Sequence, residues 1–266
     1  MILRRFTQHL KDQNWFAVGL EVIVLIVGIF LGMQVTEWND ERKEKQLEDE
    51  YLALLSRDLM AINKTLSEQL AHEQFIIEAS TKALKYINNP DQEFKPVEFG
   101  QLLSQMWGRR TLTLQSPIFT ELKSAGRLSI IRDNKLRNSI MEYFDSLVRT
   151  ERVVDKNNNF QVEPFTAYLR DSGIGFVPMS DSQCKGKEGT VPCIFSKSWV
   201  QTVNGERTHS VESILGKSLS ESKVSELRAQ ITYRGMAADS TRYTVTARLD
   251  NTTQVFDLIS DYSKRN

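Results

Sequence analysis

The sequence predicts a mainly α-helical protein. An N-terminal transmembrane helix runs into a long amphipathic helix, and an extracytoplasmic helical bundle with an irregular or short β-hairpin insertion follows. Three observations support this prediction. Residues 15–35 are almost entirely apolar, residues 37–89 are rich in charge and helix formers, and residues 171–209 interrupt the helical pattern with glycines, prolines and both cysteines. The formal net charge is zero, so electrostatics give no reason to expect binding to nucleic acid.

The apolar run reads WFAVGLEVIVLIVGIFLGMQV, and Glu21 carries its only formal charge. At about 1.5 Å per residue, a helix of this length just crosses the roughly 30 Å hydrocarbon core of a bilayer. We therefore expect residues 15–36 to be a transmembrane helix, with Trp15 and Trp38 at the two membrane interfaces, where indole rings are favoured. The alternative is a cleaved signal peptide, but the run is long for one and no A-x-A cleavage site follows.

Two observations bear on the orientation of the span. Basic residues flank it equally, so the positive-inside rule gives a tie. Cys184 and Cys193 are separated by eight residues in a glycine-containing segment that can close into a disulfide, which would persist outside the cytoplasm. Two unrelated free thiols are the alternative. We favour the disulfide, and hence a cytoplasmic tail over residues 1–14 and a bulk domain outside.

Residues 37–89 contain neither proline nor glycine. Apolar residues recur there at steps of four, three, four and four, which is the spacing of an amphipathic helix; they are Leu55, Leu59, Ile62, Leu66 and Leu70. This helix should end near Asn88, where NNPD follows. It suits either a coiled-coil stalk or one long helix of a bundle, and the drift of the apolar stripe after Leu70 argues against a long strict heptad.

Residues 90–170 are predicted to complete a helical bundle, because their helix-boundary signals are clear. Ser116 and Asp133 can cap helix N-termini, Pro117 suits a first helical turn, and Gly126 suits a left-handed C-terminal cap. Residues 171–209 should form an irregular region with a short hairpin near 194–203. Residues 210–266 should form C-terminal helices, over about 220–236 and 238–264.

Two stretches resemble a known family. EVIVLIVGIFLGMQVTEWNDERKEK has a glutamate early in the span, a glycine before a short apolar tract, and then a glutamine and a tryptophan–asparagine pair; these residues are Glu21, Gly28, Gln34, Trp38 and Asn39. SPIFTELKSAGRLSIIRDNKLRNSIMEYF is a helix, a glycine turn and a helix that ends in aromatic residues. Together they resemble a bacterial family of single-pass membrane proteins classified only as a domain of unknown function. The resemblance implies a bacterial inner-membrane location and no particular activity, and it does not include residues 171–209.

The sharpest functional candidates lie in the predicted span. An ionisable side chain within a membrane is costly and often functional, so Glu21 suits a proton site or a polar clasp between helices; a carboxylate near the interface, reached by water, is the alternative. Gly28 and Gly32 are four residues apart, a spacing that lets two helices approach closely in lipid. Glu21, Leu25, Gly28 and Gly32 fall along one helix face. We therefore expect this face to contact a second copy of the chain or a different membrane protein.

No enzymatic, metal or cofactor site is expected from the sequence. His9, His72 and His209 are far apart, and none has ligand spacing with the cysteines. The chain is thus predicted to be a membrane-anchored, non-enzymatic interaction or scaffold protein, with the lipid bilayer and a homo-oligomer or membrane partner as its contacts. A ligand-sensing or transport accessory protein is the second hypothesis. An enzyme whose carboxylates meet only on folding is the third.

Overall fold

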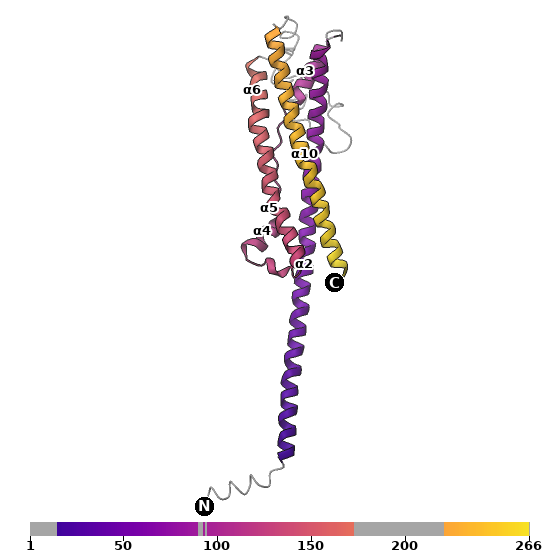
Figure 1. Cartoon of the computed structure of the whole chain (residues 1–266), viewed down its shortest axis with the longest axis vertical. Coiled ribbons are helices and arrows are strands. Elements are labelled where there is room, and N and C mark those ends of the chain that lie inside the picture. The colour runs from indigo at the N-terminus through magenta and orange to yellow at the C-terminus, as the bar shows by residue number, and fades with distance from the viewer. Residues whose placement is uncertain (1–14, 90–92, 94, 173–220, 266) are drawn as a thin grey trace, which may run out of the picture. The chain divides into compact units, whose positions relative to one another are not determined.

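The computed structural model describes residues 15–89, 93, 95–172 and 221–265, and this part of the chain is mainly helical (Figure 1). The helices are α2 (Trp15–Asn88), α3 (Pro96–Gln105), α4 (Pro117–Ser124), the 3₁₀ turn η1 (Leu128–Ile130), α5 (Asn134–Asn157), the π-helix η2 (Asn158–Val162), α6 (Glu163–Asp171) and α10 (Glu221–Arg265). No strand occurs within these ranges. The mainly α class is therefore confirmed. The tail 1–14, the hairpin near 194–203 and the pair Cys184 and Cys193 lie outside the described residues.

The chain divides into two compact units, Met1–Leu52 and Ala53–Asn266, with the boundary inside α2. In the first unit, α2 contains the one described stretch that is long and apolar enough to cross a membrane, with a mean hydropathy of 2.1. Its large apolar side chains from Leu20 to Val35 are between 49% and 64% exposed. Because none of them is buried inside the protein, the stretch has the character of a membrane span or a signal sequence rather than of a core helix.

In the second unit, α2 is a helix of a bundle, and one row of its buried residues keeps heptad spacing. This row recurs at alternating steps of four and three, and its members are Leu55, Leu59, Ile62, Leu66, Gln69, Glu73, Ile76, Ser80 and Ala83. His72 and Ala79 are buried beside the row. The drift expected after Leu70 is therefore wrong. The row continues through Gln69, Glu73 and Ser80, which an apolar count does not register because they are polar.

The C-terminal residues form the single helix α10 rather than two helices. One row of its buried residues also keeps heptad spacing, and its members are Leu227, Ile231, Arg234, Ala238, Thr241, Val245, Thr252, Val255 and Ile259; Ala237 is buried beside the row. A Cβ atom placed on Gly235 would lie 3.1 Å from the Cβ of Ser80. Glycine inside a helix costs about 0.5–1 kcal/mol relative to alanine, and here it allows α10 to approach α2 closely.

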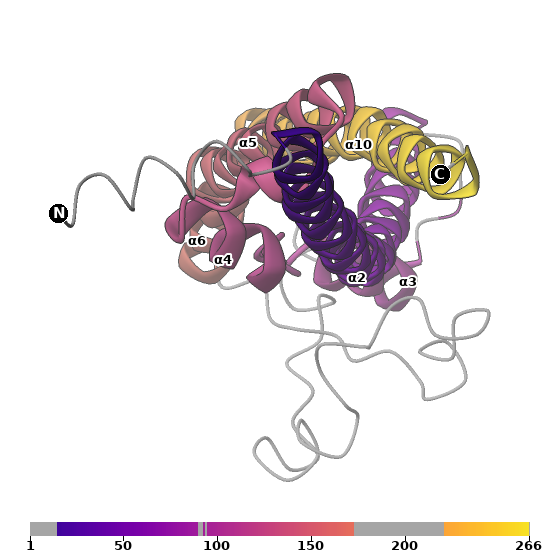
Figure 2. The same cartoon turned by 90° about the horizontal axis from the view of Figure 1, so that it is seen from below.

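Helices α5 and α10 lie side by side and antiparallel (Figures 1 and 2). The Tyr143 hydroxyl lies 2.8 Å from that of Thr252, and one end of the pair is thus fixed. Further along, the Asn157 amide donates to the Thr241 hydroxyl at 3.0 Å. As residue numbers rise in α5 they fall in α10, so the two helices run in opposite directions.

The helix boundaries follow the signals in the sequence. The Ser116 hydroxyl accepts a hydrogen bond from the Phe119 amide, and the Asp133 carboxylate accepts one from the Leu136 amide. Gly126 follows α4 with a φ of 67°, a left-handed conformation that glycine adopts without steric cost. These three caps confirm the predicted helix–turn–helix arrangement of residues 117–148.

Between α3 and α4 the chain turns at Met106 and Trp107 and then runs back along α2 in an extended course. The Ser80 hydroxyl contacts the sulfur of Met106, and the Ser116 hydroxyl donates to Asp58 of α2. Ten extended residues and twenty-two helical residues both cover about 33 Å, since the rise per residue is about 3.3 Å in extended chain and about 1.5 Å in a helix. We call residues 106–116 the extended segment. Side chains bury alternately along it, with Leu112 and Leu114 inside.

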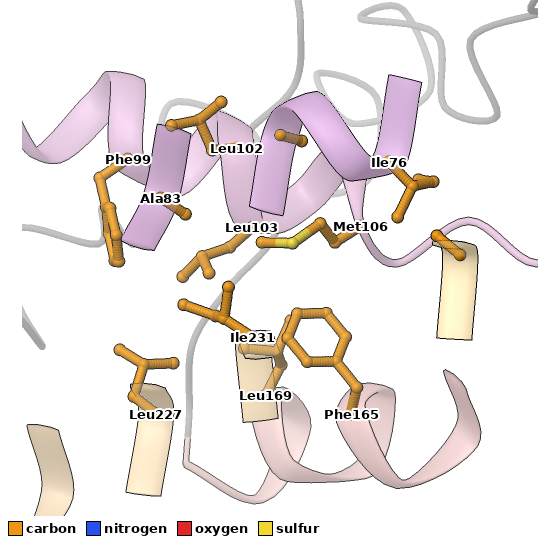
Figure 3. Packing of buried hydrophobic residues seen from close by; sticks show 12 residues of the cluster. Ile76, Ala83, Phe99, Leu102, Leu103, Met106, Phe165, Leu169, Leu227 and Ile231 are labelled. Atoms are coloured by element: carbon orange, nitrogen blue, oxygen red, sulfur yellow. The ribbon is translucent and has the colours of Figure 1, made fainter. Parts of the chain in front are cut away.

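An apolar cluster joins the extended segment to four helices (Figure 3). Phe99 and Leu103 of α3 point toward Leu227 and Ile231 of α10, and Phe165 of α6 lies beside Ile231. Met106 closes the cluster next to Ile76 of α2. Burying each large apolar side chain contributes about 1.5–3 kcal/mol relative to leaving it in water, so this cluster anchors one end of the extended segment.

Candidate functional site

The residues predicted to act in the span all lie in α2, and no described residue packs against them. Leu25 is 62% exposed, and a Cβ atom added to Gly28 or Gly32 would meet nothing within 4 Å. The Thr36 hydroxyl donates to the Gly32 carbonyl at 3.0 Å, so its hydrogen bond is satisfied inside the helix. The glycines are thus not required by contacts in the described chain. Glu21 is exposed on the same stripe, Trp38 is exposed further along α2, and Trp15 is the first residue of α2.

A second candidate site lies in the bundle, where polar residues are buried in the heptad rows and beside them. We call it the polar layer, and it comprises Gln69, His72 and Glu73 of α2 with Arg234 of α10. All four residues are at most 6% exposed. Buried polar and charged groups are costly unless they are hydrogen-bonded or neutralised, so the partners of each group decide what the layer can do.

Arg234 connects α10 to the extended segment. Its Nε donates to the Met106 carbonyl at 2.9 Å, and a terminal nitrogen donates to the Gly108 carbonyl at 3.0 Å. Burial lowers the pKa of the guanidinium to about 10, although the nearby Glu73 opposes this shift. Arg234 therefore remains a cation at neutral pH. Because Met106 and Gly108 lie outside any regular helix or sheet, their buried carbonyls depend on side-chain donors such as Arg234.

Arg110 attaches the extended segment to α2 through its side chain and to η2 through its backbone carbonyl. Its guanidinium donates to the backbone carbonyl of Glu68 at 3.3 Å and to the Glu68 carboxylate at 3.2 Å. Its own carbonyl accepts a hydrogen bond of 2.8 Å from the Asn158 side-chain amide. Its neighbour Arg109 pairs with Glu163 at the start of α6. Residues 106–110 are thus attached to α2, η2, α6 and α10 through side chains.

The π-helix η2 brings Asn158 to this position. Three consecutive steps of four, from Thr150 to Val162, interrupt the alternation of four and three in one buried row of α5, η2 and α6. The row is Ile140, Tyr143, Leu147, Thr150, Val154, Asn158, Val162, Phe165 and Leu169. In a regular α-helix the additional step of four would rotate the row away from the core. A wider π-turn absorbs the extra residue, and single π-turns of this kind are frequent at functional sites.

Glu73 is a buried carboxyl group with one polar neighbour in contact. The Gln69 amide donates to its Oε1 at 2.6 Å, and among the described residues no cation lies within ion-pair distance of it. Burial raises the pKa of Glu73 to about 7, although the charges of Arg234 and Arg110 and the Gln69 hydrogen bond oppose the rise. The carboxyl group therefore titrates near neutral pH.

His72 is the only one of the three histidines that the structure describes, and it is held neutral. Burial lowers its pKa to about 3, and the positive charges of Arg234 and Arg110 act in the same direction, while a hydrogen bond with the Gly108 backbone opposes them. Its Nδ1 and the Oε1 of Gln69 have no hydrogen-bond partner among the described residues. His9 and His209 lie outside those residues.

The polar layer was not predicted from the sequence. His72 was considered only as a metal ligand, and no group of three potential metal-ligating side chains occurs in the described part of the chain. The available signal was the spacing itself, because Gln69, Glu73 and Arg234 stand in heptad register with apolar residues on both sides.

Comparisons of the chain with family models, with curated proteins and with solved structures find no match. The resemblance to a bacterial membrane-protein family therefore stays a prediction, and functional arguments rest on the two sites themselves.

Proposed function

We propose that this chain is a membrane-anchored, non-enzymatic interaction or scaffold protein of the bacterial inner membrane. Its N-terminus lies in the cytoplasm, its helical bundle lies in the periplasm, and its span associates with a second copy or with another membrane protein. The observation that carries the proposal is the open face of α2. Glu21, Gly28 and Gly32 share one stripe, and nothing in the described chain contacts the two glycines.

The physical argument concerns what a polar group and small residues do in lipid. A carboxyl group is costly in the hydrocarbon region unless a partner or water reaches it. Glycines remove side-chain bulk, so a second helix can approach the backbone and reach the same stripe. Since the glycines serve no packing within the described chain, contact with another helix gives them a role.

Association is tested by cross-linking the full-length chain in native membranes, isolated without detergent. Gly28→Leu and Gly32→Leu should each reduce the cross-linked fraction, because a leucine side chain on the contact face keeps two helices apart. Gly19→Leu is the matched control, since Gly19 is also open and lies on the opposite face of α2. Unchanged cross-linking in both contact-face variants, or recovery of the chain in the aqueous fraction, would contradict the proposal.

A second candidate function, ligand sensing or transport assistance, is supported by the polar layer. The buried Nδ1 of His72 and Oε1 of Gln69 are two polar atoms that a hydrogen-bond donor of a small molecule would satisfy. A thermal-shift screen of small polar compounds on the detergent-solubilised full chain tests this candidate. A stabilising compound should lose its effect in a His72→Phe, Gln69→Leu double variant, and absence of any stabilising compound argues for the scaffold function alone.

A further inference from the structure

Helix α10 has a second row of residues on the side turned away from the core, and we call it the outer row. The row recurs at steps of three and four, and all of its members are exposed. They are Tyr233, Met236, Ser240, Tyr243, Ala247, Asn251, Gln254 and Leu258. The four large apolar side chains among them are between 44% and 76% exposed. No described element therefore packs over this face of α10.

The outer row contains no charged residue, although 26% of the residues in the chain are charged. A helix face that meets only water normally carries charged and polar residues together. In a parallel pair of equivalent helices, by contrast, each residue of the contact row faces its own copy, so any charge there would meet a like charge. Ser240 and Ala247 stand between the larger side chains and leave room for those of a facing helix. The row therefore suits contact with a second copy of α10.

The two edges of the outer row carry opposite charges at the same level along α10. On one edge is Arg149 of α5, which stands between Ser146 and Thr150, and the hydroxyls of these two residues accept hydrogen bonds from Arg248 of α10. On the other edge is Asp250, two residues from Arg248 in the same helix. Arg149 and Asp250 are both exposed, and neither makes an ion pair with another described residue.

These charged edges favour one arrangement of two copies. In a parallel two-fold pair, the edge of one copy that carries Arg149 faces the edge of the other that carries Asp250, and symmetry repeats this contact. In an antiparallel pair, equivalent edges would face each other, and Arg149 would meet its own copy. Like charges in an interface are unfavourable, so charge complementarity selects the parallel pair.

We propose that the outer row of α10 docks in parallel onto the outer row of a second copy of this chain, with Arg149 of each copy beside Asp250 of the other. Because the partner is a second copy anchored in the same membrane, this docking rests on the proposed function. The outer row has only four large apolar side chains and offers a small contact. Two copies anchored in one membrane have a high effective concentration, which allows a weak contact to form.

The docking is tested by photo-cross-linking of the full-length chain in native membranes, with p-benzoylphenylalanine in place of Tyr243. Irradiation should give an adduct of twice the mass of the chain that contains no other protein. Val148 is the matched control position, because it is 54% exposed. It lies two residues from both Ser146 and Thr150, on the face of α5 that is turned away from α10. The same probe at Val148 should give little of the double-mass adduct.

Charge reversal tests the arrangement of the two copies. With the probe at position 243, Arg149→Glu and Asp250→Arg should each lower the yield of the double-mass adduct severalfold, because each places like charges opposite one another. The double variant, Arg149→Glu with Asp250→Arg, should restore the yield, since the opposed charges then attract again. A variant that lowered the yield by disturbing the fold would not be restored in this way.

Several outcomes would overturn the docking. They are a Tyr243 adduct with a different protein, a cross-link confined to one chain, equal yields of the double-mass adduct from the two probe positions, and a double variant no better than the single ones. Failure of the proposed function has a different signature, because association through the span would then be insensitive to Gly28→Leu and Gly32→Leu. Association that depends on these glycines, without a double-mass adduct from position 243, would overturn the docking alone.

Discussion

Replacing Arg234 with methionine should lower the free energy of unfolding of the bundle by about 3 kcal/mol, the largest loss we expect from a single substitution. Methionine fills a similar volume but donates no hydrogen bond. The Met106 carbonyl would then be buried without its side-chain donor, and Gly108 would keep only its hydrogen bond with His72. Denaturant unfolding of the full-length chain in micelles, followed by far-ultraviolet circular dichroism, measures the change.

The control for this prediction is Arg242→Met on the same helix. Arg242 is partly exposed and pairs with the exposed Asp239 one turn away. Exposed ion pairs of this kind contribute about 0–1 kcal/mol, so the unfolding midpoint should hardly move. If the two methionine variants unfold at the same denaturant concentration, Arg234 does not hold the extended segment as described.

The stability of the bundle should depend on pH through two opposed titrations in the polar layer. The folded state raises the pKa of Glu73 from 4.5 to about 7, so this stabilisation is complete below pH 4.5 and is lost as the pH rises to about 7. The folded state lowers the pKa of His72 from 6.5 to about 3, so this stabilisation is complete above pH 6.5 and is lost as the pH falls to about 3. Between pH 4.5 and 6.5 the titration of Glu73 lowers the free energy of unfolding with rising pH, and the titration of His72 raises it by a similar amount, so the two contributions cancel.

Removing one of the two groups should therefore make the free energy of unfolding depend on pH, with opposite signs for the two variants. In Glu73→Gln only the His72 titration remains, so the free energy of unfolding should rise by about 2 kcal/mol from pH 5 to pH 6.5. In His72→Gln only the Glu73 titration remains, and stability should fall by about 2 kcal/mol over the same interval. Denaturation series at four pH values measure both slopes. Profiles for the two variants that run parallel to the wild type would show that neither group is buried in the folded state as described.

Several polar residues are buried in the core of the bundle. Buried polar groups in helical bundles can fix the register of the helices, because any shift along the axis leaves them without partners. Arg234 of α10 binds two carbonyls of the extended segment, and Asn158 of η2 binds the Arg110 carbonyl of the same segment. These two side chains therefore fix the position of the extended segment against α10 and η2.

Much of the fold follows from local chemistry that the sequence displays directly. Helix formers without proline or glycine predict α2 beyond the apolar run, and Ser116, Asp133 and Gly126 mark helix ends that the structure confirms. The apolar run at residues 15–35 is apparent from hydropathy alone, because its residue types have few alternatives to lipid or a protein core. These features can be predicted from the sequence because each depends on residues within a few positions of one another.

The polar layer and the π-helix depend on tertiary structure and could not be predicted from the sequence alone. Whether Glu73 faces water or the core depends on which distant segments pack around α2. Glu73 and Arg234 are both buried although they are 161 positions apart in the chain, and a count of apolar residues treats both as surface. Likewise, the extra residue at η2 matters only because α5 and α6 must present their buried rows to the same neighbours. Burial is a property of the assembled bundle, so the pKa values and hydrogen bonds that depend on it appear only once distant segments are packed together.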